Sequence, residues 1–160
     1  MQEVKFATTE AELNTIIALR YEILRKPWSQ PAATASDELE WESNNAYLSD
    51  EDGNVVACGR LQKNTEQLGQ IRFMAVADAY QGKGYGRKIL EALEKEARLQ
   101  QLTVIELQAR ENALEFYLRC GYLKIEATFK LWDLIQHYRM RRHVNSEILS
   151  AHISKIQSST

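Results

Sequence analysis

The chain has 160 residues, 44% of them hydrophobic, which suits one domain with a single apolar core. Its formal net charge is −2 and its charged residues are scattered, a pattern that points neither to a nucleic-acid partner nor to an anionic membrane surface. The sequence has no apolar run of about 18 residues and no signal-peptide core at its start. We therefore expect a cytoplasmic protein with no membrane partner.

Two cysteines, Cys58 and Cys120, stand in apolar contexts. Their spacing fits neither a metal site nor a redox pair. The sequence therefore predicts two buried, reduced thiols and no bound metal.

Apolar runs and alternating patterns predict seven strands. They span residues 2–7, 46–49, 54–61, 70–76, 103–109, 122–131 and 135–141. The acidic turn at 50–53 joins the second and third strands as a hairpin, and a polar turn precedes the fourth. Three consecutive antiparallel strands are therefore expected in the first half of the chain.

Three helices are expected between these strands. The first begins at a capping box formed by Thr9 and Glu12 and ends before Pro27. The second covers 86–99, and the third runs from a cap at Asn112 to residue 118 or 119. The long connection at 26–43 has room for one short helix. Residues 143–160 are polar and are expected to form a loose helix or a disordered tail after a domain at 1–142.

Glycines at alternate positions, Gly82, Gly84 and Gly86, separate the fourth strand from the second helix. Without a Cβ, they allow positive φ and a close approach of a ligand to the backbone. The helix that follows offers unpaired N–H groups and a favourable dipole for an anion. The stretch therefore predicts a phosphate or pyrophosphate site, the alternative being a tight turn without a ligand. The Gly-x-Gly-x-Gly spacing fits neither a P-loop nor a dinucleotide fingerprint.

Three stretches resemble the GCN5-related N-acetyltransferase (GNAT) family. Residues 81–86 fit its Gln/Arg-x-x-Gly-x-Gly/Ala motif, and 107–122 match a segment in which Asn-Ala is followed by Phe-Tyr and then Gly-Tyr. Residues 135–140 are similar to a closing strand of one bacterial branch. The resemblance covers about 4–142 and is weakest before residue 46.

The resemblance implies an α+β fold, with a mixed, mostly antiparallel sheet that is flanked by helices and splayed between its fourth and fifth strands. Acetyl-CoA, the acyl donor, would enter the splay along the backbone of the fourth strand and rest its pyrophosphate on the glycine loop. The residues implied in binding it are Met74, Ala75, Val76, Gln81, Gly82, Lys83, Gly84, Tyr85, Gly86, Arg87, Asn112 and Phe116. Lys83 and Arg87 are equally consistent with surface residues, and Asn112 with a helix cap.

The implied reaction is N-acetylation of a primary amine on a small molecule or peptide, by direct attack on the thioester. Tyr117 matches the position of the family's general acid, and a phenol with a pKa near 10 can give a proton to the departing thiolate. The alternative is a tyrosine packed in the core. Glu106 is the candidate base, on the same strand face as Gln108; acidic residues of the 26–43 connection remain alternatives.

Residues expected to contact the acceptor are Arg20, Trp28, Glu40, Arg72 and Gln108. Each has a structural alternative: the arginines can form ion pairs, Glu40 can be a solvated charge, and Trp28 can pack on the sheet edge. Arg72 interrupts an apolar strand, so it needs a partner if it is buried.

Two functions compete. One is the acetyltransferase; the other is a non-catalytic module that binds acyl-CoA as a sensor. The presence of Tyr117 favours the enzyme. A homodimer through the late strands or the tail is a further expectation.

Overall fold

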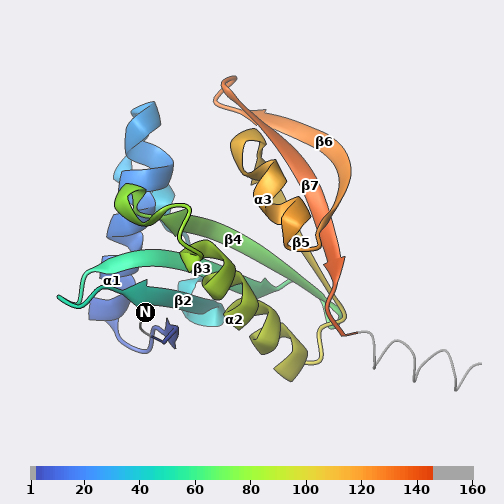
Figure 1. The fold of residues 1–160 in the computed structure, drawn as a ribbon, viewed down its shortest axis with the longest axis horizontal. Coiled ribbons are helices and arrows are strands. Elements are labelled where there is room, and N and C mark those ends of the chain that lie inside the picture. Colours follow the sequence, from blue (N-terminus) through green and yellow to red (C-terminus); the bar gives the residue numbers. More distant parts are fainter. Residues whose placement is uncertain (1–2, 146–160) are drawn as a thin grey trace, which may run out of the picture. The chain divides into compact units, whose positions relative to one another are not determined.

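The computed structural model describes residues 3–145, which fall into two compact units (Figure 1). The first unit comprises the described residues up to Gln62 together with Ile71–Leu93. The second comprises Lys63–Gln70 together with the described residues from Glu94 onward.

The first unit contains four strands in the order β1-β2-β3-β4. These are β1 (Lys5–Phe6), β2 (Asn44–Ser49), β3 (Val55–Lys63) and the Ile71–Val76 part of β4 (Leu68–Val76). The pairs β1–β2 and β2–β3 are antiparallel. The predicted hairpin between β2 and β3 is confirmed, because Asp50 N–H donates to the carbonyl of Asn54 at 2.9 Å.

The first helix, α1 (Glu10–Arg20), begins at the predicted cap. The Thr9 hydroxyl accepts from the N–H of Glu12 at 3.2 Å, and the Glu12 carboxylate accepts from the N–H of Thr8 at 3.2 Å. A π-helical turn, Tyr21–Arg25, extends α1 as far as the predicted stop before Pro27.

The connection after α1 was predicted to have room for one short helix, and the structure holds more than that. It contains three short 3₁₀ turns, at Lys26–Trp28, Ala32–Ala35 and Glu40–Glu42. Their backbone N–H groups bond to carbonyls three residues earlier, as in Ser29 to Lys26 at 3.0 Å and Thr34 to Pro31 at 3.1 Å. Sequence patterns for such short turns are weak, because a 3₁₀ turn needs only one or two bonds.

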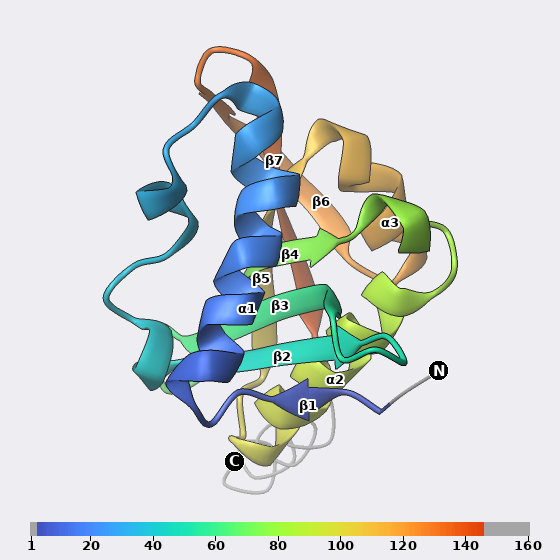
Figure 2. The ribbon, with the colours of Figure 1, turned by 90° about the vertical axis from the view of Figure 1, so that its left-hand side faces the viewer.

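Helices cover both faces of the first unit's sheet. The α1 face has a core of Ile16, Leu19, Tyr47, Cys58 and Ala75 (Figure 2). The other face receives the start of α2 (Tyr85–Leu99), whose Ile89 and Leu93 lie over Gly59 of β3. Cys58 and Gly59 are consecutive, so β3 presents one to each helix.

The second unit contains β5 (Val104–Arg110), β6 (Leu123–Leu131) and β7 (Ile135–His143). Together with the Leu68–Gln70 part of β4, they follow the order β4-β5-β7-β6, and β7 is antiparallel to both β5 and β6. Helix α3 (Leu114–Arg119) lies against β5 and β6 (Figure 1). Strand β6 stands at the edge of this sheet and exposes large apolar side chains, among them Leu123 and Phe129.

The predicted helix cap at Asn112 is corrected by the structure. Asn112 lies inside a 3₁₀ turn, Glu111–Ala113, that precedes α3, and neither segment has a side-chain cap. The extra turn moves the start of the α-helix two residues beyond the asparagine.

A buried carboxylate ties the second half of α2 to the end of the second sheet. Glu94 accepts from the Tyr122 hydroxyl at 2.9 Å and from Arg142 at 2.8 Å. Val144, just after β7, is also buried, and its carbonyl accepts from Arg98 of α2. Ordered structure thus continues past the predicted boundary at 142; the rest of the predicted tail, 146–160, lies outside the described residues.

The predicted α+β class is confirmed, with mostly antiparallel strands flanked by helices. Cys58 and Cys120 are both buried and free, as predicted. None of the helices in the described part of the chain is both long and apolar enough to cross a membrane. The predicted splay between the fourth and fifth strands stays a prediction.

We predict that Gly59→Ala destabilises the protein by about 1–3 kcal/mol, the usual cost of overpacking a core. A Cβ at this position would clash with the Met74 sulfur and lie 2.8 Å from Ile89 Cγ2. Chemical denaturation measures the change, and the double variant Gly59→Ala/Met74→Ala should regain part of the loss. Stability equal to the unmodified protein would show that α2 can shift without cost.

Candidate functional site

The loop between β4 and α2 has the geometry of an anion site. Gly82 and Gly84 both have positive φ, at 75° and 86°. A Cβ on either glycine would meet no atom within 4 Å, so the space beside the backbone is open. The carbonyl of Gly84 accepts the helical bond from Lys88 N–H at 3.1 Å, so α2 starts directly from this loop. Gly86 differs from the expectation, because it lies inside α2 without a positive φ.

Gln81 holds the loop against the end of β4. Its side-chain amide donates to the carbonyl of Val76 at 3.0 Å and to the carboxylate of Asp78 at 3.2 Å. Its backbone N–H donates to the carbonyl of Asp78 at 3.4 Å. The predicted anion contact from Gln81 N–H therefore competes with an internal bond, whereas the glycines that follow are more open.

Aromatic and basic side chains surround the loop. The rings of Tyr80 and Tyr85 meet edge to face, with centroids 5.2 Å apart. The Lys83 ammonium lies 5.8 Å from the Tyr80 ring centroid, and both Lys83 and Arg87 are exposed. Basic residues at an anion-binding helix start add favourable charge. Ala75 contributes its side chain to the core, which leaves its backbone as its means of contact with a ligand.

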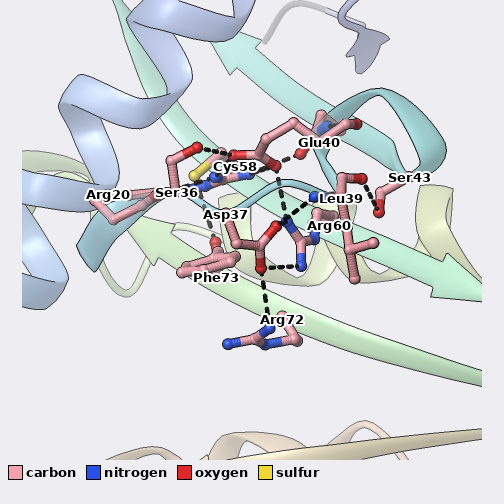
Figure 3. Close-up of polar contacts among 12 residues, drawn as sticks. Arg20, Ser36, Asp37, Leu39, Glu40, Ser43, Cys58, Arg60, Arg72 and Phe73 are labelled. Atoms are coloured by element: carbon pink, nitrogen blue, oxygen red, sulfur yellow. Dashed lines mark hydrogen bonds and ion pairs between the residues drawn. The ribbon is translucent and has the colours of Figure 1, made fainter. Parts of the chain in front are cut away.

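A second feature of the first unit is a buried cluster of charges centred on Glu40 (Figure 3). Arg20, at the end of α1, is fully buried and pairs with Glu40, and it also donates to Asn45 at 2.7 Å. Arg60 of β3 is equally buried and donates to Glu40 at 2.8 Å. Ser36 adds a further hydrogen bond to the Glu40 carboxylate at 2.9 Å. The cluster thus joins α1, the connection and two strands.

Asp37 extends the cluster to Arg72 (Figure 3). Its carboxylate accepts from Arg60 at 2.7 and 2.8 Å and from Arg72 at 3.2 Å. These arginines hold the pKa of Asp37 at about 2, with Arg60 the largest contributor, and Arg20 helps to lower the pKa of Glu40 against the effect of burial. The structure therefore places Arg20, Glu40 and Arg72 in one ion-pair cluster. Arg20 pairs with Glu40 and Arg72 pairs with Asp37, which is the structural alternative to contacts with an acceptor.

Phe73 stands among the guanidinium groups in an unusual conformation. Its φ is 55°, in the left-handed region that non-glycine residues rarely adopt within a strand. The guanidinium carbons of Arg20, Arg60 and Arg72 lie 4.3, 4.9 and 4.8 Å from its ring centroid. Strict strand alternation would separate Arg72 from Phe73, so the left-handed residue brings the two side chains to one side. Such strain costs about 1–3 kcal/mol and is most often kept at functional sites.

Tyr117 of α3 is buried at 7% exposure, in a cluster of aromatic rings. Its ring meets Phe116 and Tyr122 edge to face at 5.0 and 5.8 Å. Burial raises the pKa of Tyr117 well above the ordinary value, so its hydroxyl stays protonated at neutral pH. Within residues 3–145 that hydroxyl makes no hydrogen bond, in contrast to the Tyr122 hydroxyl, which is bonded to Glu94.

The candidate base, Glu106, is occupied by cations. It pairs with Arg141 and lies 3.7 Å from Arg139. Gln108 lies on the same face of β5, as predicted, and accepts from the Thr128 hydroxyl at 2.6 Å. A role as base would require Glu106 to act from within an ion pair.

Sequence reasoning missed Asp37 and Arg60 as members of the site. Arg60 gave a usable signal, because it interrupts the apolar run of β3 as Arg72 interrupts that of β4. Asp37 gave none, since acidic residues abound in its loop. Of the other predicted residues, Trp28 is half-buried in its 3₁₀ turn and Asn112 is exposed.

A sequence model of the acetyltransferase (GNAT) family matches residues 13–122, from the core of α1 to the Gly-Tyr pair after α3. The chain belongs to the GNAT family. This confirms the resemblance that the glycine loop and the Phe-Tyr segment indicated.

The chain is also similar to two bacterial acetyltransferases. An N-acetyltransferase of unassigned function from Bacillus subtilis, YjcF, is 29% identical over 85% of this chain and 96% of its own length. An amino-acid acetyltransferase from Mycobacterium tuberculosis is 40% identical over 76 residues, 48% of this chain; the match spans only 42% of that protein.

A solved GNAT structure, an aminoglycoside 6'-N-acetyltransferase complexed with coenzyme A, shares the fold at a TM-score of 0.75. It is 12% identical, and the likeness covers 89% of this chain and 97% of that one. At this identity the likeness shows the fold alone.

We predict that the GNAT domain loses stability as the pH falls from about 4 towards 2. The pKa of Asp37 is lowered from 3.8 to about 2, so its contribution is complete above its unfolded pKa and disappears as it is protonated. The free energy of unfolding falls by at most about 1.4 kcal/mol per pH unit for each proton taken up on unfolding.

Denaturant titrations at several pH values measure this slope. Asp37→Asn should be less stable at pH 6 and should flatten the decline below pH 4. Glu38→Gln, a change at the exposed neighbouring residue, is the control and should follow the unmodified protein. An unchanged slope in Asp37→Asn would contradict the assignment.

Proposed function

We propose that the protein transfers the acetyl group of acetyl-CoA to a primary amine of a small molecule or peptide. The observation that carries this proposal is the loop at 82–84, where two glycines with positive φ open the backbone beside the start of α2. Membership of the GNAT family supports it, as does the coenzyme A complex of the structural neighbour. We assign the activity to the domain predicted at 1–142, together with His143 and Val144, which continue its ordered structure.

The residues present fit the donor. The N–H groups from Gly82 to Gly86 receive the pyrophosphate, with Lys83 and Arg87 adding positive charge. The backbone of Met74, Ala75 and Val76 pairs with the pantetheine arm as an added strand would, and Asn112 and Phe116 contribute from the α3 segment. Acetyl-CoA supplies an activated thioester, and the protein supplies orientation and charge.

Acyl transfer then depends on three tasks of the chain. The acceptor amine must be held neutral and close to the thioester carbonyl. The Met74 N–H stabilises the negative charge that develops on the carbonyl oxygen. Tyr117 donates its proton to the departing thiolate; its hydroxyl is protonated at neutral pH and makes no hydrogen bond within the described residues, so the proton is not engaged elsewhere. Glu106 is the proposed base, through water, and Arg20, Trp28, Glu40, Arg72 and Gln108 are the proposed acceptor-side residues.

We predict that Gly84→Val weakens coenzyme A binding about tenfold or more, because a side chain would close the backbone to the pyrophosphate. Gly53→Val is a matched control: Gly53 has φ 85°, is also free of neighbours within 4 Å, and lies in the β2–β3 turn. Both variants carry the same backbone strain, so only the loop variant should lose affinity in calorimetry. Equal affinities would remove the loop from the donor site.

We predict that Tyr117→Phe lowers kcat about 10²-fold with little change in coenzyme A affinity, because a general acid contributes about 10²–10⁴-fold. Its melting temperature should change little, since the hydroxyl makes no hydrogen bond within the described residues. Tyr122→Phe is the converse control: it loses the bond to Glu94, so it should melt lower while retaining kcat. Thiol release from acetyl-CoA over an amine panel gives the rates. A wild-type kcat in Tyr117→Phe would exclude Tyr117 as the acid, and cofactor binding without turnover of any amine would favour the sensor.

A further inference from the structure

The charge cluster of the first unit holds more positive than negative charge. Four guanidinium groups lie within 6 Å of the Phe73 ring centroid, those of Arg20, Arg25, Arg60 and Arg72. Two carboxylates, Asp37 and Glu40, pair with members of this group. Among the groups that pair with one another, three guanidinium groups (Arg20, Arg60 and Arg72) face two carboxylates, which leaves a surplus of one positive charge. A partly buried surplus of this kind is unfavourable unless an anion joins it.

The surplus lies at Arg72. Arg20 and Arg60 are fully buried and engage Glu40 on both sides. The side chain of Arg72 is 39% exposed and shares one oxygen of Asp37 with Arg60. Arg25 donates to the carbonyls of Leu24 and Thr34, and the charges that lower its pKa, after burial, are those of Arg72 and Arg20. The site thus presents positive charge on its accessible side.

Arg72 has the shape to receive a carboxylate. Its guanidinium is planar and offers five N–H donors, a fork that matches the two oxygens of a carboxylate. One of its nitrogens, Nη1, is used by Asp37. In Figure 3 the guanidinium of Arg72 extends beyond Asp37, away from the buried half of the cluster. The guanidinium carbon of Arg72 lies 4.8 Å from the Phe73 ring centroid, a distance at which an aromatic ring attracts a cation.

We propose that Arg72 forms a subsite for a carboxylate carried by the acceptor amine. The acceptor class is therefore amino acids and related amines with a carboxylate a few bonds from the nitrogen. This rests on the proposed acetyl transfer and narrows its acceptor. Arg72 is two residues before Met74 on the same strand. A carboxylate bound at Arg72 thus places a nearby amine beside the backbone assigned to the thioester.

The experiment compares each of a panel of free amino acids with its own amide, in the unmodified protein and in Arg72→Gln. The unmodified protein should prefer the acid, and Arg72→Gln should reduce the ratio of kcat/KM for acid over amide by about 10–100-fold, the usual loss for a charged hydrogen-bonded pair. An amino acid and its amide differ in the basicity of the amine. Because the acid-to-amide ratio is compared between the two proteins, this difference drops out. Arg72→Lys keeps the charge without the fork, so it should give an intermediate ratio. Lys5→Gln removes an exposed cation of β1 and should leave the ratio unchanged.

A binding measurement separates this proposal from the acetyl transfer itself. Calorimetry with coenzyme A present compares N-acetylglycine with N-acetylglycinamide, and it requires no turnover. Tighter binding of the acid, lost in Arg72→Gln, supports the subsite even if no amine is acetylated. Equal binding of acid and amide would overturn the proposal, and so would a preference for the acid that survives in a folded Arg72→Gln. A comparison of donors gives a third contrary outcome: if the unmodified protein prefers succinyl-CoA over acetyl-CoA and Arg72→Gln does not, the carboxylate belongs to the donor.

Discussion

The first unit depends on one carboxylate that is almost fully removed from water. Glu40 is 5% exposed and lies between two fully buried guanidinium groups, those of Arg20 and Arg60. Burying these ions is expensive, and their mutual ion pairs offset that cost, although the Nε atoms of Arg20 and Arg60 have no hydrogen-bond partner within the described residues. The end of α1, the long connection and β3 must therefore come together in a single arrangement, since any other leaves a charge without its counterion.

The same arrangement prepares the chemistry. Because the buried half of the cluster fixes Asp37, that residue in turn orients Arg72, and the guanidinium carbon of Arg72 lies 4.8 Å from the ring centroid of the left-handed Phe73. The strand that carries these groups also leads, through Val76 and the bond from Gln81, to the glycine loop. The proposed carboxylate subsite and the proposed pyrophosphate site thus lie on one continuous stretch, 72–84.

Local rules predicted the features that depend on neighbours in sequence. The capping box at Thr9, the hairpin at 50–53, the positive φ of Gly82 and Gly84, and the alternation of Glu106 and Gln108 all follow from a few adjacent residues. The pairing of Asp37 with Arg60 joins residues 23 apart, and no local pattern selects it among many acidic side chains. The left-handed Phe73 was not predictable either, because propensity argues against it and only the surrounding cluster holds it in place.

The close contact between Gly59 and α2 affects how variants at residue 59 should be interpreted. The helix rests directly on the main chain of β3, through Ile89 and Leu93, and it begins directly after the glycine loop. A Cβ at residue 59 would press against Ile89 and Leu93. We therefore expect it to displace α2 and, with it, the loop at the start of that helix. A substitution at this core position can therefore weaken ligand binding by the loop without itself contacting the ligand.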